Sequence, residues 1–221
     1  MAAAKIIYYT DILSSWCTFA EEPLAKVRAR FGADLDYEWR VALLRDGAPL
    51  GYDQEMLGWY YGRSNSMSGV MLNVTWLESK SDATRWPNVA AEAARSLGNT
   101  DDTVRLALAK AGMIDGQHVQ HREVTERVAA AASGLDAARL HKAMDDPTVA
   151  ERIRATTAEF RALPCSVVPT FLITNEIGDV NLLSGTFRYE PLAACVEQMI
   201  ADAKAYAKYT AANPPPASVK P

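Results

Sequence analysis

The chain has 221 residues, of which 49% are hydrophobic, and its formal net charge at pH 7 is -4. This length and composition suit one compact domain with a sizeable core and an insertion. The negative charge and the lack of a basic run argue against binding to nucleic acid or to a membrane surface. Three cysteines, an odd number, do not form a disulfide framework. The first residues show no signal-peptide pattern, so we expect a cytoplasmic protein.

The first part of the chain has a strand–helix–strand pattern. Residues 4–12 are β-branched and aromatic, which predicts a buried strand. Apolar side chains at three- and four-residue steps then predict a helix that is capped by Ser14 or Ser15 and kinked at Pro23. Residues 34–43 alternate in polarity and predict a second strand, parallel to the first. The carboxyl ends of such strands are where ligands bind in open α/β sheets.

The middle of the chain is predicted to be helical. Residues 43–54 predict a loop, and residues 58–69 predict a mobile loop or an irregular helix, because that segment combines Gly and Ser with aromatic side chains. From residue 88 to residue 144 the Ala-rich sequence predicts several short helices. Residues 148–164 predict a longer amphipathic helix.

The last part of the chain returns to strands. Residues 167–174 and 180–185 predict two strands joined by a turn, and an amphipathic helix follows them. The element order predicts a thioredoxin-type α/β fold with an inserted all-helical domain. The predicted parts are residues 1–50 and 148–208 for the thioredoxin domain, 51–147 for the helical insertion, and 209–221 for a Pro-rich disordered tail.

Two motifs resemble those of a known family. D-I-L-S-S-W-C after the first strand and V-V-P-T-F-L-I about 150 residues later resemble the DsbA-like thioredoxin-fold proteins. More narrowly, they resemble the cytoplasmic branch of FrnE-type oxidoreductases, 2-hydroxychromene-2-carboxylate isomerases and kappa-class glutathione transferases. The resemblance covers residues 4 to about 205. It implies that Pro169 follows a cis peptide bond and that Val168 presents its backbone to an extended peptide such as glutathione.

The first motif holds only half of a Cys-x-x-Cys pair. Ser14 stands where the redox relatives have the nucleophilic Cys, and Cys17 stands at the second position. A hydroxyl cannot exchange disulfides, so the ordinary dithiol cycle is excluded. In the isomerase and kappa-class relatives a Ser at this position donates a hydrogen bond to the sulfur of glutathione. The resemblance therefore implies that glutathione is the cofactor, Ser14 and Cys17 are catalytic candidates, and Ser15 and Trp16 contribute to binding.

A second part of the implied glutathione site follows the last strand. Kappa-class relatives have Gly-Ser-Asp-Arg there, and this chain has Gly185, Thr186, Phe187 and Arg188. The resemblance implies that Gly185, Thr186 and Arg188 hold the γ-glutamyl end. Phe187 replaces the acid, which weakens recognition of the amino group, and the surrounding sequence is closer to the FrnE type.

Aromatic side chains are frequent in the first part of the helical insertion. We expect most of them to pack the insertion against the thioredoxin domain, but in this family that junction forms the pocket for the second substrate. An aromatic-lined cleft suits a flat hydrophobic molecule. The pocket candidates are Trp59, Tyr60, Trp76 and Trp86.

Three functions remain open at this stage. The favoured one is a glutathione-dependent transferase, isomerase or lyase acting on a small hydrophobic, aromatic or unsaturated substrate. The alternatives are a thiol–disulfide oxidoreductase, or its single-cysteine S-x-x-C variant using Cys17, and a non-catalytic binding protein on the same scaffold. We expect no nucleic-acid, membrane or metal partner, since no His and Cys share a metal-binding spacing. The kappa-class relatives imply a homodimer.

Overall fold

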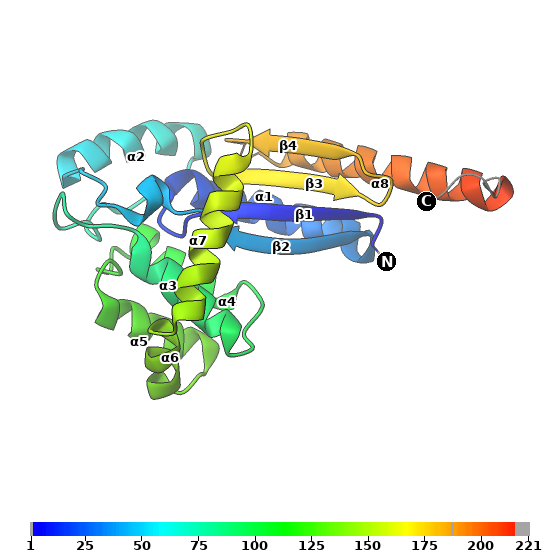
Figure 1. Cartoon of the computed structure of the whole chain (residues 1–221). Helices are drawn as coiled ribbons and strands as arrows, with labels where there is room; N and C mark the ends of the chain where they lie inside the picture. The colour runs from blue at the N-terminus through cyan, green and yellow to red at the C-terminus, as the bar shows by residue number, and fades with distance from the viewer. Residues whose placement is uncertain (1, 187, 215–221) are drawn as a thin grey trace.

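The computed structural model describes residues 2–186 and 188–214. At its centre is a four-stranded mixed sheet with the order β2-β1-β3-β4 (Figure 1). β1 (Ala4–Thr10) pairs parallel with β2 (Leu35–Val41) and antiparallel with β3 (Thr170–Asn175), which pairs antiparallel with β4 (Val180–Ser184). The parallel β1–β2 pair, joined by a helix, is the βαβ unit that the sequence predicts.

Three long helices cover the sheet. α1 (Ser15–Phe31) and α8 (Tyr189–Ala212) pack against each other on one face. α7 (Pro147–Ala162) crosses the other face near the carboxyl ends of β1 and β2 (Figure 1). The N-terminus of α1, which carries the S-S-W-C motif, therefore lies at the end of the sheet where β1 stops.

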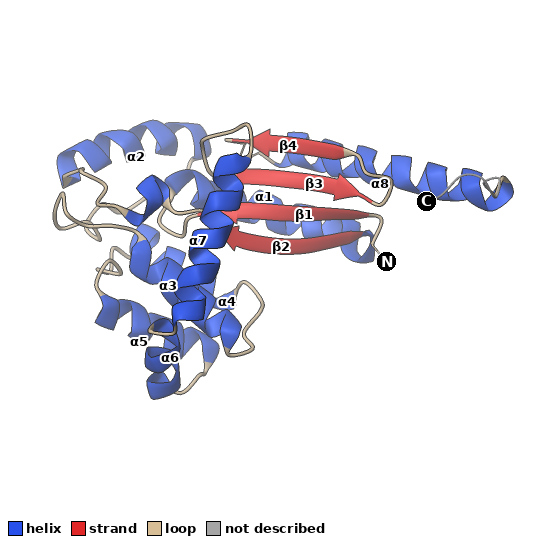
Figure 2. Cartoon of the chain, in the orientation of Figure 1, coloured by secondary structure: helices blue, strands red, loops and turns tan. Residues whose placement is uncertain are grey.

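Between β2 and α7 the ordered elements are all helical (Figure 2). This arrangement confirms the predicted fold class, a thioredoxin fold with a helical insertion. Within the described residues, no helix is both long and apolar enough to span a bilayer. The inserted helices are α2 (Gln54–Ser68), α3 (Arg85–Ser96), α4 (Thr103–Ala109), α5 (Arg122–Ser133) and α6 (Ala137–Met144), with a π-helical turn at Lys110–Ile114 after α4.

Two segments are more regular than the sequence predicts. α2 is a helix of 15 residues where a loop or irregular helix was expected, because Asp53 caps it by accepting a hydrogen bond from the Met56 N–H at 2.9 Å. Gly69 ends α2 in the left-handed region, with φ 75°. α8 continues to Ala212, into the segment predicted to be a tail, and residues 215–221 of that prediction lie outside the described residues.

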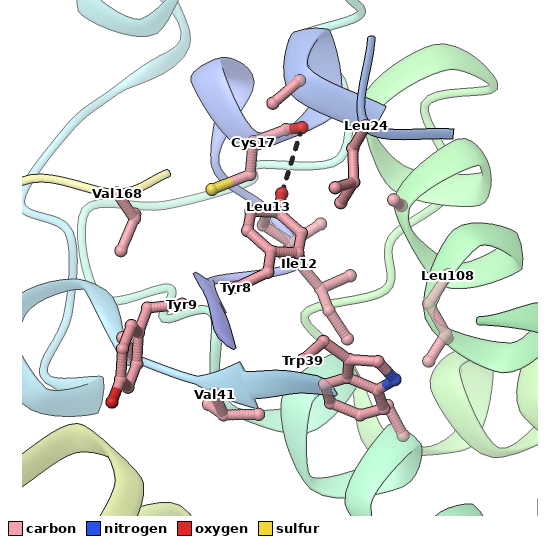
Figure 3. Packing of buried hydrophobic residues seen from close by; sticks show 14 of the residues in the cluster. Tyr8, Tyr9, Ile12, Leu13, Cys17, Leu24, Trp39, Val41, Leu108 and Val168 are labelled. Carbon is pink, nitrogen blue, oxygen red and sulfur yellow. Dashed lines mark hydrogen bonds between the residues drawn. The ribbon is translucent and has the colours of Figure 1, made fainter. Parts of the chain in front are cut away.

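Tyr8 of β1 anchors α1 to the sheet. Tyr8 is fully buried and stacks on Phe171 of β3, with ring centroids 5.0 Å apart. Its hydroxyl lies 3.4 Å from the Cys17 carbonyl oxygen and 3.0 Å from a Glu21 carboxylate oxygen, and its single proton serves these two acceptors. Figure 3 shows the first of these contacts as a dashed line, among the buried side chains that surround it. Tyr8 therefore ties the first two turns of α1 to the sheet.

A buried ion-pair network joins α1 to the insertion. Arg105 of α4 is 2% exposed and forms hydrogen bonds with both carboxylate oxygens of Glu21 on α1. It also donates to Asp102 at 2.9 Å, which accepts from Tyr37 and Arg28 as well. Glu21 and Asp102 thus compensate a guanidinium that would otherwise be costly to bury.

Replacing Arg105 tests how strongly this network holds the two parts together. Arg105→Met keeps the apolar stem but leaves the largely buried Glu21 without a cation and Asp102 with Arg28 alone, so the free energy of unfolding should fall by about 3–5 kcal/mol. Urea denaturation measures this loss. Arg30→Met is the control: it breaks the exposed ion pair with Glu197 and should reduce stability far less than Arg105→Met does. Equal losses in the two variants would contradict the network's role.

Candidate active site

Ser14 forms the N-cap of α1. Its backbone is extended, with φ -88° and ψ 122°, and its Oγ accepts a hydrogen bond from the Cys17 N–H at 3.4 Å. Of the two serines predicted to cap the helix, Ser14 is therefore the one that does so. Its side chain stands at the positive end of the helix dipole, which favours an anion beside it.

A cavity of about 480 Å³ opens beside Ser14. Five segments line it: the N-terminus of α1, the loop after β2, the helix α2, the segment after α2 that holds Trp76, and the end of α7 with the loop that follows. Ser15 and Trp16 line the cavity together with Ser14, as the sequence predicts for the motif. The cavity lies between the thioredoxin domain and the insertion, where the resemblance places a substrate pocket.

Cys17 does not line this cavity. The side chain is 2% exposed, and burial raises the pKa of its thiol to about 11, although a hydrogen bond with Ser14 acts in the opposite direction. Figure 3 shows its sulfur within the core, on the side where Val168 lies. A buried and protonated thiol is a poor nucleophile. Ser14 is also buried, at 5% exposed, but it lines the cavity, so it is the group of this pair that a ligand in the cavity can reach.

The loop before β3 forms another wall of the cavity. The Val168–Pro169 peptide bond is cis, and Val168 lines the cavity. The Thr170 hydroxyl donates to the Val167 carbonyl oxygen at 2.6 Å, and the Gly185 N–H donates to the Pro169 carbonyl oxygen at 2.8 Å. The loop is thereby tied to the end of β4, and both sequence motifs meet at one cavity.

The predicted γ-glutamyl end of the site is less well assembled. Gly185 lies beside Pro169 through its backbone hydrogen bond, but neither Gly185 nor Thr186 lines the cavity. Arg188 is exposed at the N-cap of α8 and does not line the cavity either. Phe187, the departure from the kappa-class pattern, lies outside the described residues.

The four aromatic pocket candidates divide into two pairs. Tyr60 and Trp76 line the cavity, and Trp76 is a fully buried part of its wall, donating from Nε1 to the Tyr61 hydroxyl at 3.0 Å. Trp59 is 64% exposed on α2 and does not line the cavity. Trp86 packs between two arginine side chains of the insertion, away from the cavity.

A buried carboxyl group that the sequence reasoning missed organises the cavity. Asp11 is fully buried directly after β1 and accepts hydrogen bonds from the backbone N–H groups of Leu13 and Leu44, at 3.0 and 2.9 Å. It also accepts from the Thr84 hydroxyl at 2.6 Å and the Asn88 amide at 3.1 Å. Burial raises the pKa of Asp11, and these four hydrogen bonds oppose that rise. The sequence did hold a signal for it, because an acidic residue directly after a strand predicted to be buried indicates a buried polar contact.

Three arginines line the cavity and were also missed by the sequence reasoning. They are Arg45, Arg63 and Arg161, and none of the described lining residues is acidic. Asp46 pairs with Arg161 at 2.5 Å, whereas Arg45 and Arg63 form no ion pair with a carboxylate of the described residues. The cavity is therefore electropositive although the whole chain is acidic.

The fold is that of a thioredoxin-fold protein, and the candidate site lies at the start of α1, where the two motifs meet. The chain matches the model of the DSBA-like thioredoxin domain over residues 5–197 and belongs to that family. No curated protein sequence matches the chain.

Solved structures show the same fold at low sequence identity. The cytosolic disulfide reductase DsbM from Pseudomonas aeruginosa is 18% identical, with a TM-score of 0.68 over 93% of this chain and 99% of that one. A second DsbM structure is described with GSH, at a TM-score of 0.66. 2-Hydroxychromene-2-carboxylate isomerase is 16% identical, with a TM-score of 0.63 over 93% and 98%. α-DsbA1 from Wolbachia pipientis is 12% identical, with a TM-score of 0.62 over 93% and 89%.

Burial of Cys17 predicts that its thiol resists alkylation. With a pKa of about 11, about one molecule in a thousand carries the thiolate at pH 8, and burial blocks access as well. Iodoacetamide labelling followed by peptide mass spectrometry should find Cys165, which is half-buried at the cavity, modified well before Cys17. The control is labelling in urea, where both cysteines should react at similar rates. Rapid labelling of Cys17 in the folded protein would contradict its assignment as a core residue.

Proposed function

We propose that the protein is a glutathione-dependent transferase, isomerase or lyase in which Ser14 activates the thiol of glutathione. The observation that carries this proposal is the placement of two neighbouring groups on one helical turn. The Ser14 hydroxyl faces a cavity, whereas the thiol of Cys17 is buried with its pKa at about 11. When bound, glutathione supplies the nucleophilic thiolate that the protein itself does not present.

The Ser14 hydroxyl is suited to hold a sulfur anion. Its oxygen accepts the Cys17 N–H, which does not use the hydroxyl proton; a ligand thiolate would compete with the Cys17 sulfur for that proton. A hydrogen bond to an ionised partner is worth about 1.5–3 kcal/mol, which corresponds to a lowering of the thiol pKa by about one to two units. The positive end of α1 acts in the same direction.

Other features of the cavity fit a tripeptide with two carboxylates. The volume of about 480 Å³ and the absence of acidic groups among its described lining residues suit an anionic ligand of this size. Val168 beside the cis peptide bond is the residue that would align an extended peptide. The description of the DsbM relative with GSH, and of DsbM as cytosolic, supports both glutathione as ligand and a cytoplasmic location.

A single-cysteine oxidoreductase is the second candidate. The names of two structural relatives, a disulfide reductase and a DsbA, favour it. It would require attack by Cys17, and the burial and raised pKa of that thiol oppose such a step. Ser14→Cys separates the two functions, because it should create insulin-reducing activity without improving a glutathione-dependent reaction.

Ser14→Ala tests the proposal directly. Glutathione at millimolar concentration should raise the Tm of the wild-type protein, as any ligand of the native state does. Ser14→Ala should keep most of this shift but lose about 10-fold or more in turnover of glutathione with an activated aryl halide, since it removes one charge-assisted hydrogen bond.

Ser166→Ala is the matched control for this experiment. It removes a hydroxyl elsewhere in the lining of the same cavity, at a residue with no assigned role in glutathione binding, and should leave turnover close to that of the wild-type protein. Absence of any glutathione-dependent rise in Tm in the wild-type protein would refute the proposal.

A further inference from the structure

A second cavity, of about 220 Å³, lies between α3 and α7, which pack against each other (Figure 1). We call it the α3–α7 cavity. Its described lining residues come from these two helices and are Glu92, Ser96, Thr148, Val149 and Arg152. None of these five residues lines the cavity beside Ser14, so the α3–α7 cavity is a separate place on the molecule.

The carboxyl group of Glu92 is the unusual feature of the α3–α7 cavity. Its side chain is 0% exposed, yet neither carboxylate oxygen has a hydrogen-bond partner among the described residues. Two arginines compensate its charge: Arg95 Nη1 lies 3.3 Å from Oε1, and Arg152 Nη1 lies 3.9 Å from Oε2, but neither contact has the geometry of a hydrogen bond. A buried carboxylate is costly unless it is hydrogen-bonded as well as paired, so Glu92 is short of donors.

The two arginines differ in their freedom to move. Arg95 is held by Trp39 of β2, because its guanidinium lies 3.4 Å from the ring centroid and donates to the Trp39 carbonyl oxygen at 2.8 Å. The Arg152 side chain is 54% exposed, and Glu92 is its one ion-pair partner within the part of the chain that the structure describes. Since Arg95 already balances the charge of Glu92, Arg152 carries a positive charge that a ligand can use.

The two hydroxyl groups of the α3–α7 cavity present lone pairs rather than protons. The Ser96 hydroxyl donates its proton to the Ala93 carbonyl oxygen at 2.7 Å, and the Thr148 hydroxyl donates to Asp146 at 2.8 Å. Together with Glu92, the cavity therefore has three acceptor groups beside one mobile cation. An ammonium group has three N–H donors and no acceptor, and a carboxylate pairs well with a guanidinium.

We propose that the α3–α7 cavity binds a small α-amino acid in its zwitterionic form. The ammonium group donates to Glu92 and to the two hydroxyls, and the carboxylate pairs with Arg152, which turns from Glu92 to meet it. Val149 contacts the short side chain. An amine alone would place its charge beside two arginines, and a carboxylate alone would leave Glu92 without donors, whereas a zwitterion avoids both costs. The site is independent of the proposed glutathione-dependent function.

Three probes of similar size test this assignment by two-dimensional amide NMR at matched ionic strength. They are L-alanine, propionate, which lacks the ammonium group, and ethylamine, which lacks the carboxylate. L-Alanine should cause saturable shifts in α3 and α7 around the cavity. Its affinity should be about 10-fold or more above that of either other probe, because each of those loses a charge-assisted contact.

Variants of the two charged residues make the test specific to the cavity. Glu92→Gln and Arg152→Gln should each weaken L-alanine binding by about 10-fold or more. Circular dichroism establishes that each variant is folded, and the exposed side chain of Arg152 can be replaced even if Glu92→Gln does not fold. Arg154→Gln is the control, because it removes the same charge from an exposed position on α7 outside the cavity and should leave the affinity unchanged.

Three results would overturn the inference. They are the lack of a saturable shift with L-alanine, equal affinity for the three probes, and L-alanine binding that either folded variant leaves unchanged. Since no measurement involves glutathione, failure of the proposed function would not alter these outcomes.

Discussion

The site depends on one buried carboxyl group, that of Asp11. The side chain lies where β1 ends, and its two oxygens accept hydrogen bonds from three separate segments: the β1–α1 turn at Leu13, the loop after β2 at Leu44, and the insertion at Thr84 and Asn88. Asn88 returns a hydrogen bond to the turn by accepting from the Ile12 N–H at 3.2 Å. A buried polar network that is satisfied in this way fixes the relative positions of the segments it joins.

Those segments carry the groups that face the cavity. The β1–α1 turn leads directly to Ser14, and the loop after β2 leads to Arg45. The Asp11 carboxyl group therefore fixes the backbone positions next to both the Ser14 hydroxyl and the Arg45 guanidinium. The first turn of α1 then separates two reactive groups, since Ser14 faces the cavity while Cys17 points into the core. The site thereby presents a hydroxyl and positive charge to the cavity, and the proposed glutathione-dependent function rests on this arrangement.

Periodicity and local motifs were enough to predict the sheet, the long helices and the place of the insertion. The same patterns offered Ser14 or Ser15 as the cap, and the structure has Ser14 in that place. The meeting of the two motifs at one cavity was implied by the family resemblance and not by any local pattern. The regularity of α2 was missed, since its glycines and serines suggested a loop or an irregular helix and the local signal of the Asp53 cap was not used. The lining arginines could not be found either, because nothing local distinguishes Arg63 from an ordinary surface residue. Trp59 and Trp86 were predicted to line the pocket and do not, because the sequence does not show which aromatic side chains of the insertion reach the cavity.

The central claim is that Ser14 stabilises a sulfur anion that glutathione brings, and the ionisation of bound glutathione tests it most directly. Thiolate absorbance near 240 nm is titrated between pH 5 and about 10 for the glutathione complex, after subtraction of the same titration of the free protein. The Cys17 thiol, with its pKa at about 11, contributes little over most of this range. The account predicts a bound-thiol pKa about one to two units below that of free glutathione, and a return toward the free value in Ser14→Ala. A pKa that is the same bound and free, or that Ser14→Ala leaves unchanged, would contradict it.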